Sequence, residues 1–557
     1  MHRTRRLAAL VAIVIVWTTP ALSQADTAAT VARALSLLGA GRMAEAIPVL
    51  EAVTSRDPDN ARGWSLLGYA RAQVRDLDGA LAADLKAASF EQTRPVALYN
   101  AGLIYGLKGN RDSAFAFLFR AKATRAIDLT QIGADTDAVV LRDDPRFTQL
   151  FPTAEEFAAP FVEPVRIIQE WRGEGAGDQF GWIARNIGDV DGDGVNDVTT
   201  SAPSRNTGGR DAGKVYVYST RTGKLLWIRS GDGGDQLGLG VEAAGDVNRD
   251  GVPDVVAGAP GAGKAYVFSG KDGETLLTFT GESKDDSLGR HVSDAGDVND
   301  DGYADVVIGA PANDAGGTDA GRAYVYSGKD GAILLTLTGV APGDHFGSTS
   351  AGAVRQGTAW IVIGAANAGP QHTGRTYVYR GLTDEPAFVI DSDSTGTQLG
   401  AMFVSVVGDV DHDDTADIYA SDWLNRAKGR MTGRVYVYSG RTGRPLYTLT
   451  GEAAGDGFGI GPADAGDVNR DGHDDLVIGA WQHKGAAPSG GKIYVYSGKD
   501  GTLLRAITGK VDGETLGFDA TGMGDVDGDG VPDLLVTSAW SAVNGTKSGR
   551  MYVLSGR

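Results

Sequence analysis

Residues 288–311 read LGRHVSDAGDVNDDGYADVVIGAP, and this stretch contains the signals that decide the fold. An apolar residue and a glycine open it, a loop rich in Asp and Asn follows, and the apolar run Val306 to Ala310 comes next. Such stretches recur at intervals of roughly 51 to 59 residues. Their apolar-glycine pairs are Phe180-Gly181, Leu237-Gly238, Leu288-Gly289, Phe346-Gly347, Leu399-Gly400, Phe458-Gly459 and Leu516-Gly517. Seven starts predict seven structural units.

Each unit contains the pattern of four short strands. After the apolar run, an alternating aromatic strand such as Tyr324 to Tyr326 leads through a Gly-rich turn to a strand such as Ile333 to Leu337. Four-stranded sheets repeated around an axis form a β-propeller. The seventh unit lacks its fourth strand, and Val165 to Trp171 matches that missing pattern upstream. We therefore expect the two ends of residues 165–557 to share one blade and close a seven-bladed ring.

The apolar-Gly pair, the acidic loop and the Gly-Ala-Pro signature together resemble the repeats of integrin α-subunit propellers, also called FG-GAP repeats. The resemblance covers Val165 to the end of the chain. It implies the propeller fold and calcium-binding loops, and it says less about function because one fold hosts many activities.

Six units carry Asp at positions 1, 5 and 9 of one loop and Asp or Asn at position 3. Oxygen ligands at alternate positions of a tight loop converge on one point, and Ca²⁺ takes six to eight of them. The predicted metal ligands are Asp189, Asp191, Asp193, Asp197; Asp246, Asn248, Asp250, Asp254; Asp297, Asn299, Asp301, Asp305; Asp409, Asp411, Asp413, Asp417; Asp467, Asn469, Asp471, Asp475; and Asp525, Asp527, Asp529, Asp533. We expect about six structural Ca²⁺ ions.

These loops have two alternative interpretations. They are not EF-hands, because none of the twelfth positions carries the required acid and an apolar strand, not a helix, follows each loop. The Asp and Asn residues could instead only form turns, but six copies with the same spacing favour metal binding. Glycine at the sixth position permits a sharp turn in five loops, and Asp414 replaces it in the fifth unit, where we expect strain. The fourth unit has Gly352, Val354, Gln356 and Trp360 at the ligand positions, so no ion is expected there.

The amino-terminal part has a different period. Residues 27–128 divide into three blocks of 34, in which small residues such as Gly68 and Gly102 recur beside larger apolar ones. The blocks resemble tetratricopeptide repeats, and Val139 to Phe151 resembles the segment that closes such arrays. We therefore predict a helical-repeat domain over residues 27–157, making the chain a multidomain α plus all-β protein. The resemblance implies a peptide-binding concave face; a spacer or dimerisation role is the alternative.

Composition narrows the cellular setting and the partners. Arg3, Arg5 and Arg6 precede a short apolar run, and small residues follow, so residues 1–25 are predicted to be an export signal, with an uncleaved anchor as the alternative. No later segment is long and apolar enough to span a membrane. The chain has no cysteine, which excludes disulfides, and its formal charge of −19 disfavours nucleic acid. We expect a periplasmic or secreted protein.

The variable loops between the second and third strands form the expected partner face. Trp423, Trp481 and Trp540 lie there with basic neighbours, and they could bind a protein or an acidic glycan. Alternatively, each tryptophan packs beneath its own loop.

No catalytic constellation stands out in the sequence. Propeller lyases and quinone-dependent dehydrogenases would need charged ligands in a pocket on the axis, and none is evident from the sequence. The sequence therefore favours a non-enzymatic, exported, calcium-binding adhesion or interaction module that binds a protein or glycan. A structural scaffold of an envelope assembly and a carbohydrate-active or quinone-dependent propeller enzyme are the alternatives.

Overall fold

The computed structural model describes residues 25–557 and divides into two compact units after Phe157. Residues 1–24 of the predicted export signal, which spans residues 1–25, lie outside the described residues. Within residues 25–557, no helix is both long and apolar enough to cross a bilayer.

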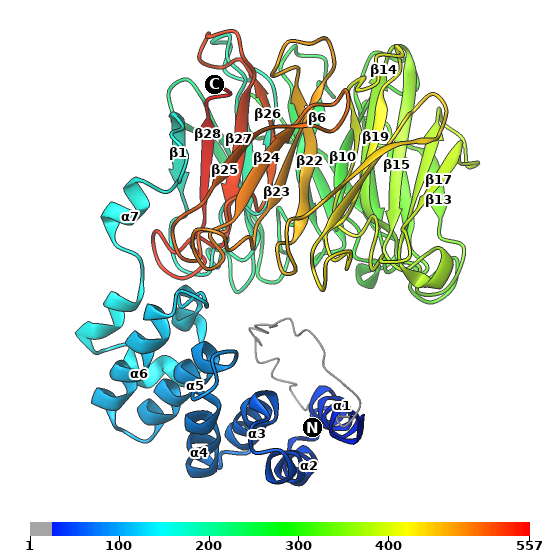
Figure 1. The fold of residues 1–557 in the computed structure, drawn as a ribbon. Coiled ribbons are helices and arrows are strands. Elements are labelled where there is room, and N and C mark those ends of the chain that lie inside the picture. The colour runs from blue at the N-terminus through cyan, green and yellow to red at the C-terminus, as the bar shows by residue number, and fades with distance from the viewer. Residues whose placement is uncertain (1–24) are drawn as a thin grey trace. The chain divides into compact units, whose positions relative to one another are not determined.

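The first unit is an array of three antiparallel helix pairs (Figure 1). The pairs are α1 (Ala25–Gly39) with α2 (Met43–Arg56), α3 (Ala61–Gln73) with α4 (Leu77–Ala87), and α5 (Arg94–Leu107) with α6 (Arg111–Ala123). A Cβ atom at Gly102 would lie 2.8 Å from the Leu118 side chain, so glycine is what lets α5 approach α6. The array is consistent with the predicted tetratricopeptide-like repeats.

Short 3₁₀ helices follow the last pair. They are η1 (Thr130–Ala134), η2 (Asp137–Leu141) and η3 (Pro145–Leu150), and a single helical turn, α7 (Ala154–Ala158), ends the segment. Leu141, Phe147 and Leu150 are buried in one cluster with Phe115 and Leu118 of α6. This segment therefore covers the apolar face that the third pair would otherwise expose, the place at which the sequence predicted a closing segment.

The second unit is a seven-bladed β-propeller of seven four-stranded sheets. The innermost strands are β2 (Ala184–Asn186), β6 (Val241–Gly245), β10 (Val292–Gly296), β14 (Phe346–Arg355), β18 (Val404–Val407), β22 (Phe458–Gly466) and β26 (Ala520–Gly524). The second strands are β3 (Val198–Ala202), β7 (Asp254–Ala259), β11 (Asp305–Ala310), β15 (Thr358–Ala365), β19 (Asp417–Asp422), β23 (Asp475–Ala480) and β27 (Asp533–Ser538). Innermost strands of successive blades contact one another around the axis, β26 and β2 included.

The third and outermost strands complete each blade. The third strands are β4 (Lys214–Tyr218), β8 (Lys264–Phe268), β12 (Arg322–Tyr326), β16 (Arg375–Arg380), β20 (Arg434–Tyr438), β24 (Lys492–Tyr496) and β28 (Arg550–Leu554). The outermost strands are β5 (Leu225–Ser230), β9 (Thr275–Thr280), β13 (Ile333–Thr338), β17 (Phe388–Asp391), β21 (Pro445–Thr450), β25 (Leu503–Thr508) and β1 (Ile167–Arg172).

The two ends of the propeller meet in one blade, as predicted. Strand β1 pairs antiparallel with β28, from Ile167 opposite Leu554 to Arg172 opposite Arg550, and Figure 1 shows cyan β1 beside red β28. An ion pair of 3.0 Å joins Glu170 of β1 to the buried guanidinium of Arg550. The amino-terminal strand thus covers an edge that would otherwise be open.

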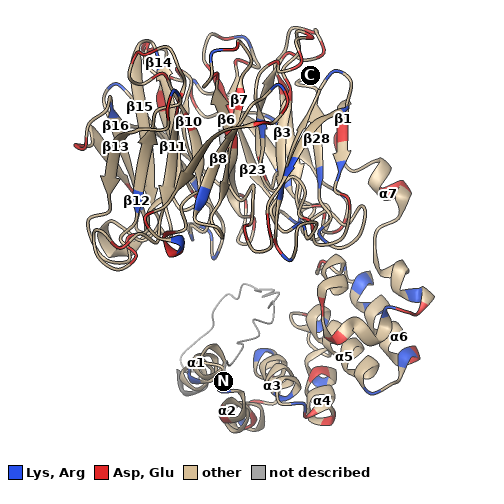
Figure 2. Cartoon of the chain, turned by 180° about the vertical axis from the view of Figure 1, so that it is seen from behind, with Lys and Arg blue, Asp and Glu red and all other residues tan. Residues whose placement is uncertain are grey.

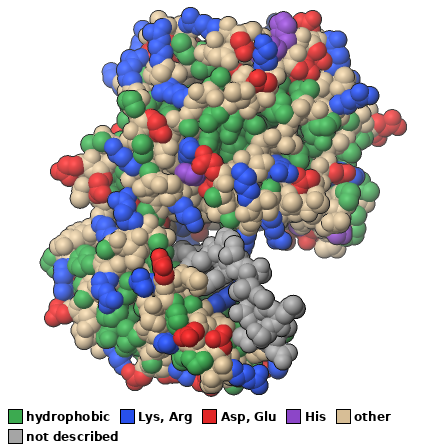
Figure 3. Space-filling model, in the orientation of Figure 1, with side chains coloured by type: hydrophobic (Ala, Val, Ile, Leu, Met, Phe, Trp, Pro, Cys, Tyr) green, Lys and Arg blue, Asp and Glu red, His purple; other side chains and the backbone are tan. Residues whose placement is uncertain are grey.

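The propeller core lies between the blades. All side chains of β7, β11, β19, β23 and β27 are buried, because sheets pack on both faces of these second strands. The outermost strands are partly exposed: Leu225, Ile333 and Leu503 each keep about half of their surface in solvent. Figure 3 shows hydrophobic side chains mixed with charged ones on the propeller surface facing the viewer.

Candidate metal centres

The six predicted acidic loops each connect an innermost strand to a second strand, and the first Asp of each folds its loop. In the first blade, Asp189 accepts hydrogen bonds from the backbone N–H groups of Gly192, Asp193 and Gly194, at 2.8, 3.1 and 2.8 Å. The first Asp of every other acidic loop accepts backbone N–H groups in the same way. Figure 2 shows that the acidic side chains of the propeller lie mainly in loops at strand ends.

The ninth-position Asp is the buried member of each loop. One carboxylate oxygen of Asp305 accepts from Val298 N at 3.0 Å, and the other accepts from Gly328 N at 3.0 Å in the turn before the outermost strand. The acidic loops and these turns therefore share one face of the propeller. Burial, with a smaller contribution from the other loop carboxylates, raises the pKa of Asp197 and Asp305 to about 6. It raises the pKa of Asp254 and Asp417 to about 7.

Carboxylates converge closely in three of the loops. One oxygen from each residue of a set lies within 4.8 Å of the others, and the sets are Asp189, Asp191 and Asp197; Asp409, Asp411 and Asp417; and Asp525, Asp527 and Asp533. Asp411 and Asp413 each bury a carboxylate oxygen that has no hydrogen-bond partner. Burial, then Asp413 and Asp409, raise the pKa of Asp411. A crowded set of carboxylate oxygens, some of them buried and without a hydrogen-bond partner, suits a hard divalent cation.

The other three loops have Asn at the third position. The amide of Asn248 donates to Asp250 at 3.3 Å, and that of Asn469 donates to Asp471 at 3.2 Å. The amide thereby relieves part of the repulsion that an all-carboxylate loop carries, while it supplies an oxygen of the kind that Ca²⁺ accepts.

Backbone geometry separates the fifth loop from the rest. At the sixth position, Gly194 and Gly302 have φ angles of 83° and 85°, and Asp414 has a φ of 63°. Asp414 thus adopts the left-handed conformation that glycine adopts in the other five loops, a conformation less favourable for a residue with a Cβ atom. The fourth blade has no acidic loop: β14 and β15 join through Gln356 and Gly357 alone, with Arg355 paired opposite Thr358.

Basic side chains near the fifth-position Asp were not anticipated from the sequence. Arg221, Arg441 and Arg557 approach Asp193, Asp413 and Asp529 at 3.3, 3.4 and 3.2 Å. Each lies three residues beyond the end of the third strand of its blade, so a basic residue at that spacing was the available signal. These cations shield the outer side of the loops.

The three predicted partner-binding tryptophans contact one another across blades, and Trp540 also lies beneath Lys547 of its own variable loop, at 4.1 Å from the ring centroid. Trp481 stacks edge-on against Trp540 at 4.8 Å between ring centroids and lies 6.3 Å from Trp423. Phe518 and Trp182 extend this aromatic cluster. Trp481 is only 7 % exposed, whereas Trp423 and Trp540 are half-buried. Trp481 is therefore a core residue, and only the outer two rings offer surface.

The axis of the propeller carries charged side chains that sequence reasoning missed. Arg185 of β2 is buried and bonds to Glu242 of β6 and to Asp519, each at 2.5 Å. These residues come from units far apart in the sequence, so no local motif joins them. The weak signal was a charged residue within an otherwise apolar innermost strand.

Comparisons with known proteins agree with this architecture. FG-GAP repeats match residues 180–218, 241–273, 292–326 and 519–554, and an FG-GAP-like repeat matches residues 467–536. Integrin alpha-3 of Cricetulus griseus is 34 % identical over 159 residues, which cover 26 % of this chain and 15 % of that protein. Integrin alpha-4 of Xenopus laevis is 29 % identical over 249 residues, which cover 42 % and 23 %.

A third relative, integrin alpha-11 of Homo sapiens, is 34 % identical over 211 residues, which cover 35 % of this chain and 17 % of that protein. The chain thus spans less than a quarter of the length of each of these relatives. The relatives described here bear the names of integrin chains and not of enzymes, in line with the non-enzymatic prediction.

Proposed function

Since the propeller carries FG-GAP repeats like those of integrin alpha chains, we propose that this protein is an exported, calcium-stabilised interaction module that binds a protein ligand. The observation that carries the proposal is the convergence of loop carboxylates, with buried oxygens of Asp411 and Asp413 left without hydrogen-bond partners. In the proposal, Ca²⁺ binds the six predicted ligand sets and holds each innermost strand to its second strand. The ions have a structural role, because each set lies within one loop.

The face opposite the acidic loops is the proposed ligand-binding face. It carries the variable loops, the half-buried rings of Trp423 and Trp540, and the cation of Lys547 4.1 Å above the Trp540 ring. Aromatic rings beside basic groups are common at protein interfaces. A glycan ligand and peptide binding by the helical repeats are further parts of this proposal.

Metal content and ligand capture test the proposal together. The chain is freed of metal, titrated with Ca²⁺ by calorimetry, and then used with Ca²⁺ or chelator to capture surface proteins and glycans of its source cell. We expect about six ions and a discrete ligand retained only with Ca²⁺. The Trp423→Ala and Trp540→Ala variants should lose that ligand, whereas Leu225→Ala on β5 should keep it.

Absence of Ca²⁺ binding would refute the metal part. A calcium-loaded propeller that retains nothing would favour a scaffold role instead.

A further inference from the structure

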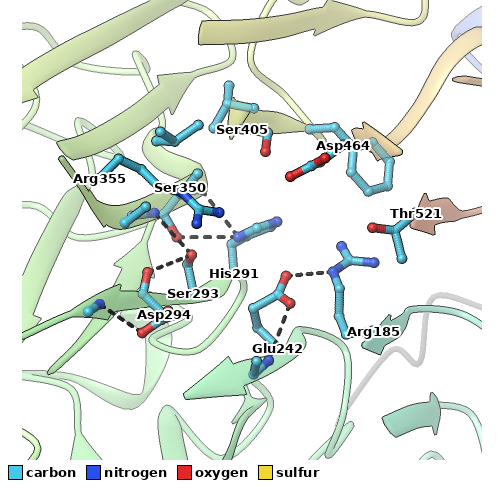
Figure 4. A pocket seen from close by; sticks show the side chains of 18 of the residues that line it. Arg185, Glu242, His291, Ser293, Asp294, Ser350, Arg355, Ser405, Asp464 and Thr521 are labelled. Carbon is cyan, nitrogen blue, oxygen red and sulfur yellow. Dashed lines mark hydrogen bonds and ion pairs between the residues drawn. The ribbon is translucent and has the colours of Figure 1, made fainter. Parts of the chain in front are cut away.

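A polar cavity of about 290 Å³ lies on the axis of the propeller. Innermost strands of all seven blades contribute to its lining, from Arg185 in the first to Thr521 in the seventh (Figure 4). The space is large enough for several water molecules. A small metabolite fits this volume.

One guanidinium in the wall is buried and only partly satisfied. Arg185 has a side chain 6 % exposed; its Nε donates to Glu242, and its Nη1 donates to Asp519 and to the Ala184 carbonyl. Its Nη2 makes no hydrogen bond within the described structure, and Figure 4 shows the guanidinium turned into the cavity. Arg185 thus holds a fixed, buried donor toward the space.

Three more groups in the wall have unused hydrogen-bonding capacity. Thr521 is 9 % exposed, and its hydroxyl, which has no partner among the described residues, faces the cavity in Figure 4. The hydroxyl of Ser405 on β18 is likewise unpaired within the described chain. Asp464 of β22 accepts a single hydrogen bond, from Gly466 N at 3.0 Å, and its carboxylate points toward Ser405.

A second guanidinium, that of Arg355, lies at the mouth. It belongs to the last residue of β14, is exposed, and forms no ion pair in the described structure. The position exists because the fourth blade joins its strands by a two-residue turn, which brings Arg355 to the place where the other blades begin their acidic loops.

Most of the remaining polar groups of the wall already have hydrogen-bond partners. His291 Nδ1 accepts from Ser350 N at 3.2 Å, and burial, with the nearby cations of Arg185 and Arg290, lowers the pKa of His291 to about 3. Ser293 accepts from Gly352 N at 3.1 Å. Asp294, like Asp464, accepts a single hydrogen bond, from Gly296 N at 2.8 Å, but burial raises its pKa to about 6, so its carboxylate is a weaker anionic acceptor. These groups shape the cavity and leave the unpaired set to bind a ligand.

The unpaired set has both signs of charge. Arg185 Nη2 and Arg355 are cationic donors, Asp464 is an anionic acceptor, and the hydroxyls of Ser405 and Thr521 can donate or accept. An inorganic cation would leave both guanidinium groups unpaired, and an inorganic anion would leave Asp464 unpaired. A small molecule that carries an ammonium and a carboxylate satisfies both.

We propose that the axial cavity binds a free α-amino acid, with the ammonium on Asp464, Ser405 and Thr521 and the carboxylate on Arg185 and Arg355. The site contains none of the predicted metal ligands and none of the rings of the aromatic cluster. A test of amino-acid binding is therefore independent of the proposed partner binding.

Calorimetry on the calcium-loaded full chain tests this site, with glycine, L-alanine and L-serine as probes. Acetate and methylamine, which each carry one of the two charges, serve as half-ligands, and glucose and Mg²⁺ represent other ligand classes. We expect an amino acid to bind at one per chain and at least tenfold more tightly than either half-ligand. Asp464→Asn and Arg355→Gln should each weaken it at least tenfold.

The matched controls are Arg210→Gln, at a guanidinium 93 % exposed and outside the cavity, and Asp384→Asn on the surface. Both should bind as the parent does, and melting temperature and calcium content should be unchanged in all four variants. Ser405→Ala gives a second test should Asp464→Asn unfold. Binding of only glucose or Mg²⁺, no binding of any probe, or equal affinity in the cavity variants would overturn the proposal.

Discussion

The fourth blade differs from the other six blades in how its inner hairpin is closed. In six blades the inner hairpin is closed by an acidic loop whose ninth residue, such as Asp305, is fully buried. In the fourth blade that position is Trp360, which is 1 % exposed and packs under the guanidinium of Arg380 at 5.0 Å. A carboxylate and an indole thus occupy equivalent buried places at the start of a second strand.

The two kinds of hairpin are stabilised by different interactions. Asp305 is held by backbone N–H groups from its own loop and from the following turn, and its loop carries further carboxylates that repel one another. Trp360 contributes apolar burial, and its hairpin needs only the turn at Gln356 and Gly357, with φ angles of 47° and 73°. Under the proposed function, a blade of the first kind depends on a cation, and a blade of the second kind does not.

Removing calcium should produce the largest effect. Because six loops would lose the ions that neutralise them, chelation should lower the melting temperature of the propeller by more than about 10 °C, each site at a hundredfold excess over Kd contributing about 2.7 kcal/mol. Differential scanning calorimetry of the full chain measures this. The transition of the helical repeats is the internal control, and an unchanged propeller transition would contradict the metal assignment.

Trp360→Ala should lower the free energy of unfolding of the propeller by about 3–5 kcal/mol, because a fully buried aromatic side chain is lost. Unlike chelation, this change should leave the number of bound ions the same. Denaturant unfolding with and without Ca²⁺ checks it, and Trp360→Phe is the conservative control, with a smaller loss. A lower ion count in Trp360→Ala would break the contrast between the two kinds of blade.

Asp301→Ala removes the fifth-position ligand of the third blade. We expect one ion fewer and a loss of about 1–3 kcal/mol in stability in Ca²⁺, with little loss in chelator because the site is then already empty. Asp330→Ala, an exposed acid in the turn of the same blade, serves as the control. Unchanged stoichiometry by metal analysis would refute the assignment of Asp301.

Asp414→Gly should give the smallest effect, and it should be stabilising. Glycine adopts the φ of 63° found at this position without the penalty of a Cβ atom, so the propeller should gain about 1 kcal/mol. Thermal melts in Ca²⁺ measure the gain. Asp300→Gly, at the fourth position of the third loop with a φ of 59°, is the comparison variant and tests whether glycine is stabilising at other left-handed positions. A loss of stability in Asp414→Gly would mean that the Asp414 carboxylate itself stabilises the loop.

Repeats and local spacing account for most of what could be predicted. The seven apolar-glycine starts, the missing fourth strand after Leu554 and the spare strand before Trp171 led to the closed ring that β1 and β28 form. The six acidic loops and the absence of one in the fourth blade could also be predicted, because the position of a residue along one loop decides which side chains can converge. The basic residues such as Arg441 that approach the loops were overlooked, because they come from a different turn of the blade.

The sequence by itself thus determined the two repeat architectures, the number of blades, the ring closure and the identity of the acidic loops, since each rests on residues near one another or on a regular period. Only the tertiary structure decided that Trp481 is core while Trp423 and Trp540 keep some surface, since neighbouring blades bring these rings together. It also decided that Arg185, Arg355 and Asp464 line one cavity. These residues belong to different blades, which only the closed ring brings together. Contacts of this kind cannot be predicted from the spacing of residues within one repeat.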